Sequence, residues 1–213
     1  MGLAEWRRSK IREYPITEFF YFAMIENLDN LLRYGILPKN EVIKSGWDYV
    51  SFAEESVQDR RHVRDIELTN HTTVTIHDLV PVYLVPRTPT LSARRDCQDR
   101  IFFIVISADI LTQENIEFAF SDGNAASKKT KFFNSLYKLK HIPWDVLKAD
   151  YWNDFPDGKR KRNAEFLIFH RIEPKYFQRI VICNPNLQEN CKKLVEQAGL
   201  SLDVVLDGSY FFT

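Results

Sequence analysis

The stretch "IFFIVIS", Ile101 to Ser107, predicts the fold more clearly than any other part of the sequence. An uncharged run of this length, rich in aromatic and β-branched residues, is typical of a strand buried on both faces. Other apolar runs on either side of it predict further strands in the same sheet, at residues 19–23, 78–85, 164–171, 179–184 and 202–206. Pro81 interrupts the second of these runs, so we expect that strand to lie at a sheet edge or to begin after the proline.

Helical patterns separate the predicted strands at irregular intervals. One pattern begins at Ile25 and ends at Tyr34, before Gly35 and Pro38, and another covers residues 186–198 and ends at Gly199. The polar stretch 122–162 also reads as helical, and residues 51–62 as a loop or short helix. This arrangement favours an α+β fold over a doubly wound sheet, with residues 1–213 as a single domain.

Composition places the chain among ordinary globular proteins. Hydrophobic residues make up 45% of it, and 29 basic residues balance 29 acidic ones, so any contact with nucleic acid must rest on local patches of charge. The three cysteines lack metal-type spacing, and no two histidines are four residues apart, so no metal site is expected. No apolar run approaches the ~18 residues of a membrane span, and no signal segment follows Met1, so we expect a cytoplasmic protein without membrane contact.

"GKRKRNAEFLIF", Gly158 to Phe169, combines a dense basic run with one carboxylate, Glu165, in an apolar strand. An acid at a strand start is most often a solvated edge residue. Burial in this apolar context would instead require a partner and would indicate a functional group. The preceding run Lys159–Arg162 is either a solvated face or an attractor of phosphates.

Two further segments carry arginines that suit anion binding. Arg60 and Arg61, with Arg64, either pair with neighbouring acids on a helix face or clamp a phosphate bidentately. In "IHDLVPVYLVPRTPTL", residues 76–91, three prolines predict a rigid surface whose Tyr83 and Arg87, with Arg94 and Arg95 beyond, can line a groove for bases and phosphates. No dinucleotide fingerprint or P-loop is present. The residues alone therefore predict an α+β domain with an anion-binding groove.

Five segments, in order, resemble the DarT family of DNA ADP-ribosyltransferase toxins. They are "MIENLDNLLRYGIL" (24–37), "SVQDRR" (56–61), "HDLVPVYLVPRTPTL" (77–91), "FSDGNAA" (120–126) and "IPWDVLKADYWNDFPDGKRKRNAEFLIF" (142–169). The last is the most specific, because it joins spaced tryptophans, a basic run and the AEF carboxylate. The resemblance implies an ADP-ribosyltransferase fold, with a split, mostly antiparallel β core and an NAD-binding cleft.

The same resemblance implies an activity and partners. Enzymes of this family move ADP-ribose from NAD to a base of single-stranded DNA, release nicotinamide, and are paired with a macrodomain antitoxin. We expect NAD as the co-substrate, no metal, and a monomer. Two alternatives remain: an RNA acceptor, or a nucleic-acid-binding module that has lost NAD turnover.

Site residues follow from the matched positions. Glu165 matches the catalytic glutamate, and Arg60 matches the catalytic arginine, with Arg61 one step away. The carboxylate would stabilise positive charge on the ribose and accept a proton from the base, while the arginine would offset the pyrophosphate charge. The implied cofactor-binding residues are Tyr21, Asn27, Arg60 and Tyr83, and the implied nucleic-acid-binding residues are Arg87, Thr90, Arg94, Arg95, Asn124, Lys159, Arg160 and Arg162.

The chain departs from the family pattern at several of these positions. Tyr21 and Met24 stand where family members carry histidines, Thr90 replaces a methionine, and Asn124 replaces a histidine on the DNA side. A tyrosine hydroxyl can still bond a ribose, but with different geometry. The modified base is therefore thymine or guanine, and the departures favour guanine.

Overall fold

The structure is a computed structural model and describes residues 1–50 and 64–212. Its centre is a sheet of order β10-β9-β5-β1-β4-β8-β6-β7. The central strands are β1 (Glu18–Met24), β4 (Leu79–Tyr83), β5 (Ile101–Ser107) and β8 (Glu165–Phe169), and the outer ones are β6 (Phe118–Ser121), β7 (Phe132–Phe133), β9 (Phe177–Ile182) and β10 (Asp203–Leu206). All neighbours pair antiparallel except β10 with β9, and a separate ribbon joins β2 (Asp65–Glu67) to β3 (Thr73–Thr75). The predicted α+β class is confirmed.

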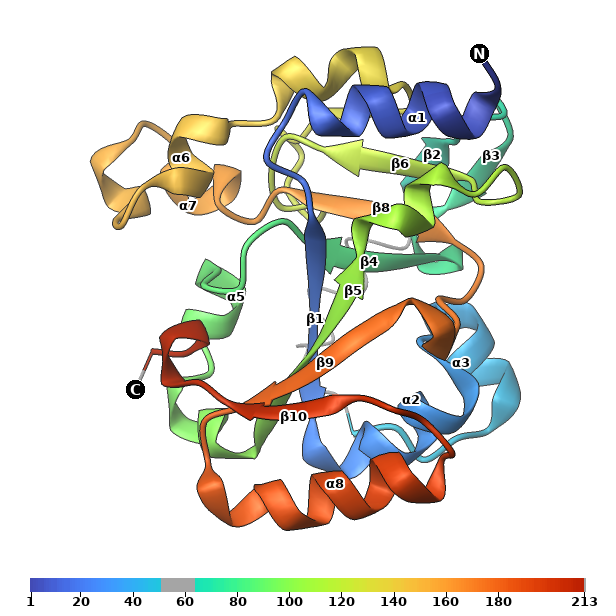
Figure 1. The fold of residues 1–213 in the computed structure, drawn as a ribbon. Helices are drawn as coiled ribbons and strands as arrows, with labels where there is room; N and C mark the ends of the chain where they lie inside the picture. Colours follow the sequence, from blue (N-terminus) through green and yellow to red (C-terminus); the bar gives the residue numbers. More distant parts are fainter. Residues whose placement is uncertain (51–63, 213) are drawn as a thin grey trace.

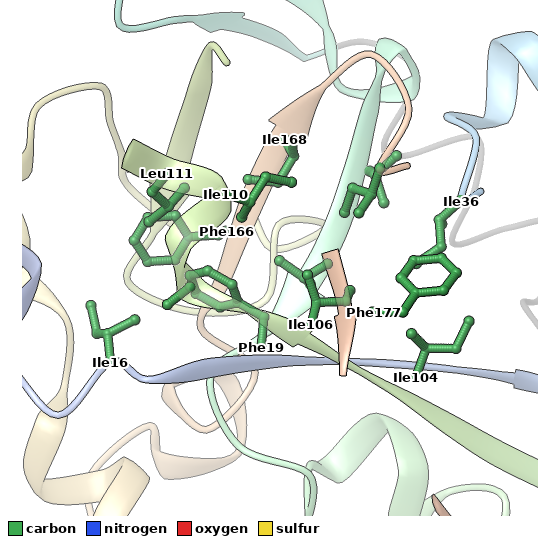
Figure 2. Close-up of a cluster of buried hydrophobic side chains, with 14 of the residues drawn as sticks. Ile16, Phe19, Ile36, Ile104, Ile106, Ile110, Leu111, Phe166, Ile168 and Phe177 are labelled. Carbon is green, nitrogen blue, oxygen red and sulfur yellow. The ribbon is translucent and has the colours of Figure 1, made fainter. Parts of the chain in front are cut away.

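The longer helices lie mainly on one face of the sheet. They are α1 (Leu3–Arg12), α2 (Leu28–Tyr34), α3 (Lys39–Ser45) and α8 (Gln188–Gln197). Side chains from α1, α2 and α8 join the main core, in which Phe19, Ile106 and Phe166 meet from three different strands (Figure 2). Gly35 ends α2 with a φ of +82°, and a Cβ there would lie 2.3 Å from the Ile172 carbonyl oxygen. The predicted glycine stop is thus required by a close backbone approach.

The other face carries a smaller core next to the last described residues. Phe22, Phe103 and Phe211 pack there with Leu91 from the short helix α5 (Pro89–Ser92). The last described residues, drawn in red, lie near α5 on the left in Figure 1. This packing places Phe212 next to a segment that the sequence assigns to nucleic-acid binding.

The sheet is split between β1 and β4. β1 pairs with β5 along all seven of its residues, but with β4 only at Phe20 and Tyr83. Beyond that pair the two strands diverge, and in Figure 1 β1 runs across the direction of β4 and β8. The split core implied by the family resemblance is therefore present.

Pro81 lies inside a strand near the middle of the sheet, contrary to expectation. β4 extends across it, and Pro81 pairs with Leu167 of β8. Because β1 touches β4 at one residue pair only, the stretch around Pro81 pairs on one side, as an edge strand does. Proline therefore still lies where a strand pairs on one side only. That position results from the split between β1 and β4, which is a feature of the tertiary structure.

The helix predicted over 122–162 is wrong. The structure has turns, strand β7 and short helices there: η5 (Leu136–His141), α6 (Trp144–Lys148), η6 (Trp152–Asp154) and α7 (Gly158–Lys161). Pro143 and Gly158 divide the polar stretch into short pieces. A helix as short as one of these pieces forms too few backbone hydrogen bonds to offset the cost of its nucleation. The remaining short helices of the described chain are 3₁₀ turns: η1 (Ile25–Asn27), η2 (Ile76–Asp78), η3 (Arg95–Arg100), η4 (Ala108–Thr112), η7 (Pro174–Tyr176), η8 (Pro185–Leu187) and η9 (Gly208–Tyr210).

Candidate active site

Glu165 is buried at the start of β8, beside the split. The residue is only 1% exposed, and its Oε1 accepts a hydrogen bond of 2.9 Å from the backbone N–H of Ala125. Tyr83 is its direct partner across the β4–β8 ladder, so both side chains project from the same face of the sheet. The expectation of a solvated edge residue does not apply to this carboxylate.

The turn that holds Glu165 is the segment "FSDGNAA". Ser121 Oγ accepts the Glu165 backbone N–H at 3.3 Å and donates to the Gly123 carbonyl at 2.7 Å. The loop then places the Ala125 N–H against the Glu165 carboxylate. The two family-like segments around Ser121 and Glu165 thus form one unit in space.

Tyr21 lies on the β1 side of the split. Its hydroxyl and that of Tyr49 are 2.9 Å apart, and burial raises the pKa of Tyr21 well above its usual value, with Tyr49 adding to the effect. Tyr21 therefore presents a neutral hydroxyl, which can hydrogen-bond a sugar.

Asn27 is buried, and its amide is engaged by one residue. Its Nδ2 donates to the Val50 carbonyl at 2.8 Å, and its Oδ1 accepts the Val50 N–H at 2.9 Å. Asn27 thus anchors the Val50 backbone to the end of η1, just before α2. Arg60 and Arg61, which were assigned to catalysis, lie outside the described residues.

The basic run is divided among three environments. Lys159 is exposed, Lys161 is partly buried, and Arg160 pairs with Asp122 at 2.7 Å and Asp157 at 2.5 Å. Arg162 is 7% exposed, and it donates to the carbonyls of Arg87, Val146, Leu147 and Ala149. The expectation that the whole run faces a nucleic-acid strand is wrong for Arg162, because its guanidinium is used inside the fold to satisfy backbone carbonyls.

Residues 87–90 are joined directly to the start of β8. Arg162 Nε donates to the Arg87 carbonyl at 3.0 Å, and the Thr90 hydroxyl donates to Asn163 Oδ1 at 2.8 Å. Burial lowers the pKa of Arg162, and the positive charge of Arg87 adds to this lowering. Residues 87–90 are therefore bonded to the two residues, Arg162 and Asn163, that come shortly before Glu165 in the chain.

Phe212 and Trp152 are partly buried aromatic residues to which the sequence patterns assigned no role. The guanidinium carbons of Arg87 and Arg95 lie 4.5 and 5.3 Å from the centroid of the Phe212 ring, and Trp152 meets it edge-on at 5.8 Å. The Phe212 N–H donates to Gln98 Oε1 at 2.7 Å. The sequence could have pointed to Trp152, because this residue lies in the matched segment 142–169. It could not have pointed to Phe212, because the position of that ring depends on packing against residues far away in the chain.

Asn124 and Arg94 are two further residues that the sequence assigns to nucleic-acid binding. The Asn124 Oδ1 accepts the Ala126 N–H at 2.9 Å within the turn that faces Glu165, and Arg94 is partly buried between α5 and η3. Within residues 1–50 and 64–212 there is no group of three or more metal-ligating side chains and no helix able to span a membrane.

Comparison with known proteins identifies relatives over most of the chain. The family model described as "ssDNA thymidine ADP-ribosyltransferase, DarT" matches residues 20–212. A DNA ADP-ribosyl transferase of Thermus sp. (strain 2.9) is 28% identical over 195 residues, which are 87% of this chain and 91% of that protein. A transferase–glycohydrolase fusion protein of Thermosipho africanus is 24% identical over 200 residues, which are 92% of this chain and 49% of the fusion.

Solved structures of the Thermus protein have the same fold. Its complex with ADP-ribosylated single-stranded DNA aligns with a TM-score of 0.83 at 25% identity, over 93% of this chain and 98% of that one. Its complex with NAD+ aligns with a TM-score of 0.78 at 22% identity, over 93% and 99% of the two chains. Both the predicted fold class and the predicted enzyme class, a DNA ADP-ribosyltransferase, are confirmed, while the family description names thymidine and offers no support for guanine. The chain belongs to the DarT family of single-stranded DNA thymidine ADP-ribosyltransferases.

Proposed function

We propose that this chain transfers ADP-ribose from NAD+ to the thymine base of single-stranded DNA, with Glu165 as the catalytic carboxylate. The observation that carries the proposal is the position of Glu165, buried opposite Tyr83 where β1 and β4 separate. The Thermus relative, whose fold matches over most of this chain, has been solved both with NAD+ and with ADP-ribosylated single-stranded DNA.

The split provides the groups that an NAD ribose needs. Tyr21 supplies a neutral hydroxyl, Tyr83 supplies a ring, and Glu165 supplies a buried carboxylate held by the Ala125 N–H. Asn27 acts by fixing residues 47–50 next to Tyr21, since Tyr49 bonds that hydroxyl. An arginine in the 51–63 segment, Arg60 by its match, would offset the pyrophosphate charge.

The reaction breaks the bond between ribose C1′ and the nicotinamide nitrogen, and the bonding electrons leave with nicotinamide. Glu165 stabilises the positive charge that develops on the ribose. The thymine ring nitrogen then forms the new bond to C1′, and its proton passes to Glu165 and from there to solvent. A single-stranded acceptor avoids the few kcal/mol needed to extrude a base from a duplex.

The DNA-binding surface in this proposal extends from Glu165 to Phe212. Arg87 and Arg95 hold phosphates while they contact the Phe212 ring, and Trp152 borders that ring. The sequence match assigns four further residues to this surface: Thr90, Arg94, Asn124 and Lys159. Arg162 is not part of it.

Incubation with NAD+ and short oligonucleotides tests the proposal. Each oligonucleotide contains one type of base, as DNA or as RNA, and adducts are detected by mass. We expect an ADP-ribose adduct on thymine DNA that the isosteric Glu165→Gln variant does not form. An adduct on RNA or guanine only would redirect the acceptor assignment, and unconsumed NAD+ would leave a binding module as the function.

The Thermosipho fusion protein motivates a partner. That protein joins a transferase to a DNA ADP-ribosyl glycohydrolase, and this chain matches about half of it. We propose that a macrodomain glycohydrolase reverses the modification made by this chain, and that residues 1–213 act as one domain and as a monomer. Co-purification with such a glycohydrolase, and light scattering of the chain alone, would test both statements.

A further inference from the structure

We propose that Arg160 is a positioning residue that shapes the 121–130 turn around the Glu165 carboxylate, and not a contact for the DNA backbone. The sequence assigns Arg160 to nucleic-acid binding together with Lys159. The inference deepens the proposed function and depends on it, because it concerns the same carboxylate.

Arg160 has two acidic partners in a largely buried setting. Its Nη1 donates to Asp122 Oδ1 at 2.7 Å and its Nε to Asp157 Oδ2 at 2.5 Å, and its side chain is only 11% exposed. Because two carboxylates already neutralise this guanidinium, it would attract a DNA phosphate only weakly. Removing it would leave the Asp122 carboxylate, 19% exposed, without its cation.

Arg160 also holds the turn through neutral groups. Its Nη1 donates to Thr130 Oγ1 at 3.1 Å, and its backbone carbonyl accepts the Asn124 N–H at 2.9 Å. Thr130 Oγ1 in turn donates to the Asn124 carbonyl at 2.6 Å. The guanidinium therefore connects both ends of the 121–130 turn.

The turn reaches the Glu165 carboxylate through the Ala125 N–H, and Arg160 controls the position of that group. The Ala125 N–H that donates to Glu165 Oε1 belongs to the same peptide group as the Asn124 carbonyl, which accepts from Thr130 Oγ1, and Thr130 Oγ1 accepts from the Arg160 guanidinium. Because the ribose carbon and the carboxylate must meet in a narrow range of geometry, a shift of about 1 Å in the turn would cost about a hundredfold in rate. Arg160 thus acts on the reaction through Asp122 and the Ala125 N–H.

Gly123 provides independent support for this close fit. A Cβ at this position would lie 2.4 Å from Arg160 Nη1 and 2.9 Å from the Arg160 carbonyl oxygen. The turn therefore requires glycine where it passes the arginine. A Gly123→Ala variant would displace the turn without removing any charge.

The test compares four variants by steady-state kinetics on thymine oligonucleotides and by the salt dependence of DNA binding. Arg160→Gln, Asp122→Asn and Gly123→Ala should each lower kcat at least tenfold, with the salt slope of DNA binding unchanged. Arg160→Lys should retain more activity than Arg160→Gln, since it keeps a cation near Asp122. Lys192→Gln, an exposed charge on α8, serves as the matched control and should behave as wild type.

The opposite outcome would overturn the inference. If Arg160 instead binds a DNA phosphate, Arg160→Gln would raise KM for DNA and reduce the salt slope by about 0.7, the value for one phosphate of a single strand, with kcat retained. Circular dichroism and thermal melting of each variant separate loss of folding from loss of positioning, and Gly123→Ala alone decides the question if Arg160→Gln does not fold. An inactive wild type would contradict the proposed function itself, whereas an active wild type with unaffected variants would contradict only the role of Arg160.

Discussion

Tyr83 and Glu165 face each other across β4 and β8 and project from the same face of the sheet, at the row where β1 makes its single pairing with β4. The Tyr83 ring also stacks on Phe22 at 5.5 Å, so β1 sets its orientation. A buried carboxylate and an oriented ring therefore meet where three strands converge. This row is where the proposed reaction would take place.

Tyr83→Ala should raise KM for NAD+ about tenfold, because it removes the ring from the proposed ribose site. Tyr83→Leu, which keeps apolar bulk, should have an intermediate effect. Initial rates at varied NAD+ and saturating DNA measure the change. An increase confined to KM for DNA would assign Tyr83 to the acceptor instead.

Phe212→Leu should raise KM for DNA about fivefold to thirtyfold, because two cation–π contacts hold Arg87 and Arg95 in place and each contributes roughly 0.5–1 kcal/mol. Phe212→Tyr keeps the ring and should resemble wild type. Tyr137→Leu is a suitable control, since Lys10 lies 5.4 Å from the centroid of that ring in another part of the molecule. If the two leucine variants bind oligonucleotides equally well, Phe212 has no role in the DNA surface.

Arg162→Gln should destabilise the fold by about 3 kcal/mol, because it leaves buried carbonyls without their donor. Urea unfolding at neutral pH measures this free energy. Lys161→Gln, the neighbouring partly buried residue, is the control and should change stability by less than about 0.5 kcal/mol. A stable Arg162→Gln protein with weakened DNA binding would restore the sequence-based assignment.

Asn27→Ala should cost about 2 kcal/mol, because it breaks both hydrogen bonds to the Val50 backbone. The same variant should raise KM for NAD+, since residues 47–50 would no longer be anchored beside Tyr21. Asn27→Asp keeps the acceptor for the Val50 N–H but loses the donor to its carbonyl, and should lie between the two proteins in urea unfolding. Equal stability of wild type and Asn27→Ala would contradict the anchoring role.

Tyr21 should make stability sensitive to alkaline pH. Burial raises the pKa of Tyr21 in the folded state above its unfolded value of about 10, so its contribution is fully present below pH ~10 and is lost as pH rises through the folded pKa. Between pH 8 and pH 11 the free energy of unfolding should therefore fall less for Tyr21→Phe than for wild type. The same fall in both proteins would show that Tyr21 ionises as freely when folded as when unfolded.

Local sequence patterns were sufficient for most of the strands and for both glycine-terminated helices. IFFIVIS is β5 with the predicted bounds, and the runs at 19–23, 164–171, 179–184 and 202–206 correspond to β1, β8, β9 and β10. These elements are predictable because their periodicity and end signals are contained within a few neighbouring residues. The helix expected over 122–162 was wrong because Pro143 and Gly158 interrupt that stretch, which forms only short helices.

What the sequence determined by itself was the family, six of the eight strands of the main sheet and the identity of Glu165 as the unusual carboxylate. What only the tertiary structure decided was the role of each charge beside it. Lys159, Arg160 and Arg162 look alike in the sequence, yet one is exposed, one is paired with two acids, and one is buried among backbone carbonyls. The burial of each side chain decides between these roles, because a buried charge needs hydrogen-bond partners. This burial depends on residues up to 75 positions away in the chain, as Arg87 is from Arg162.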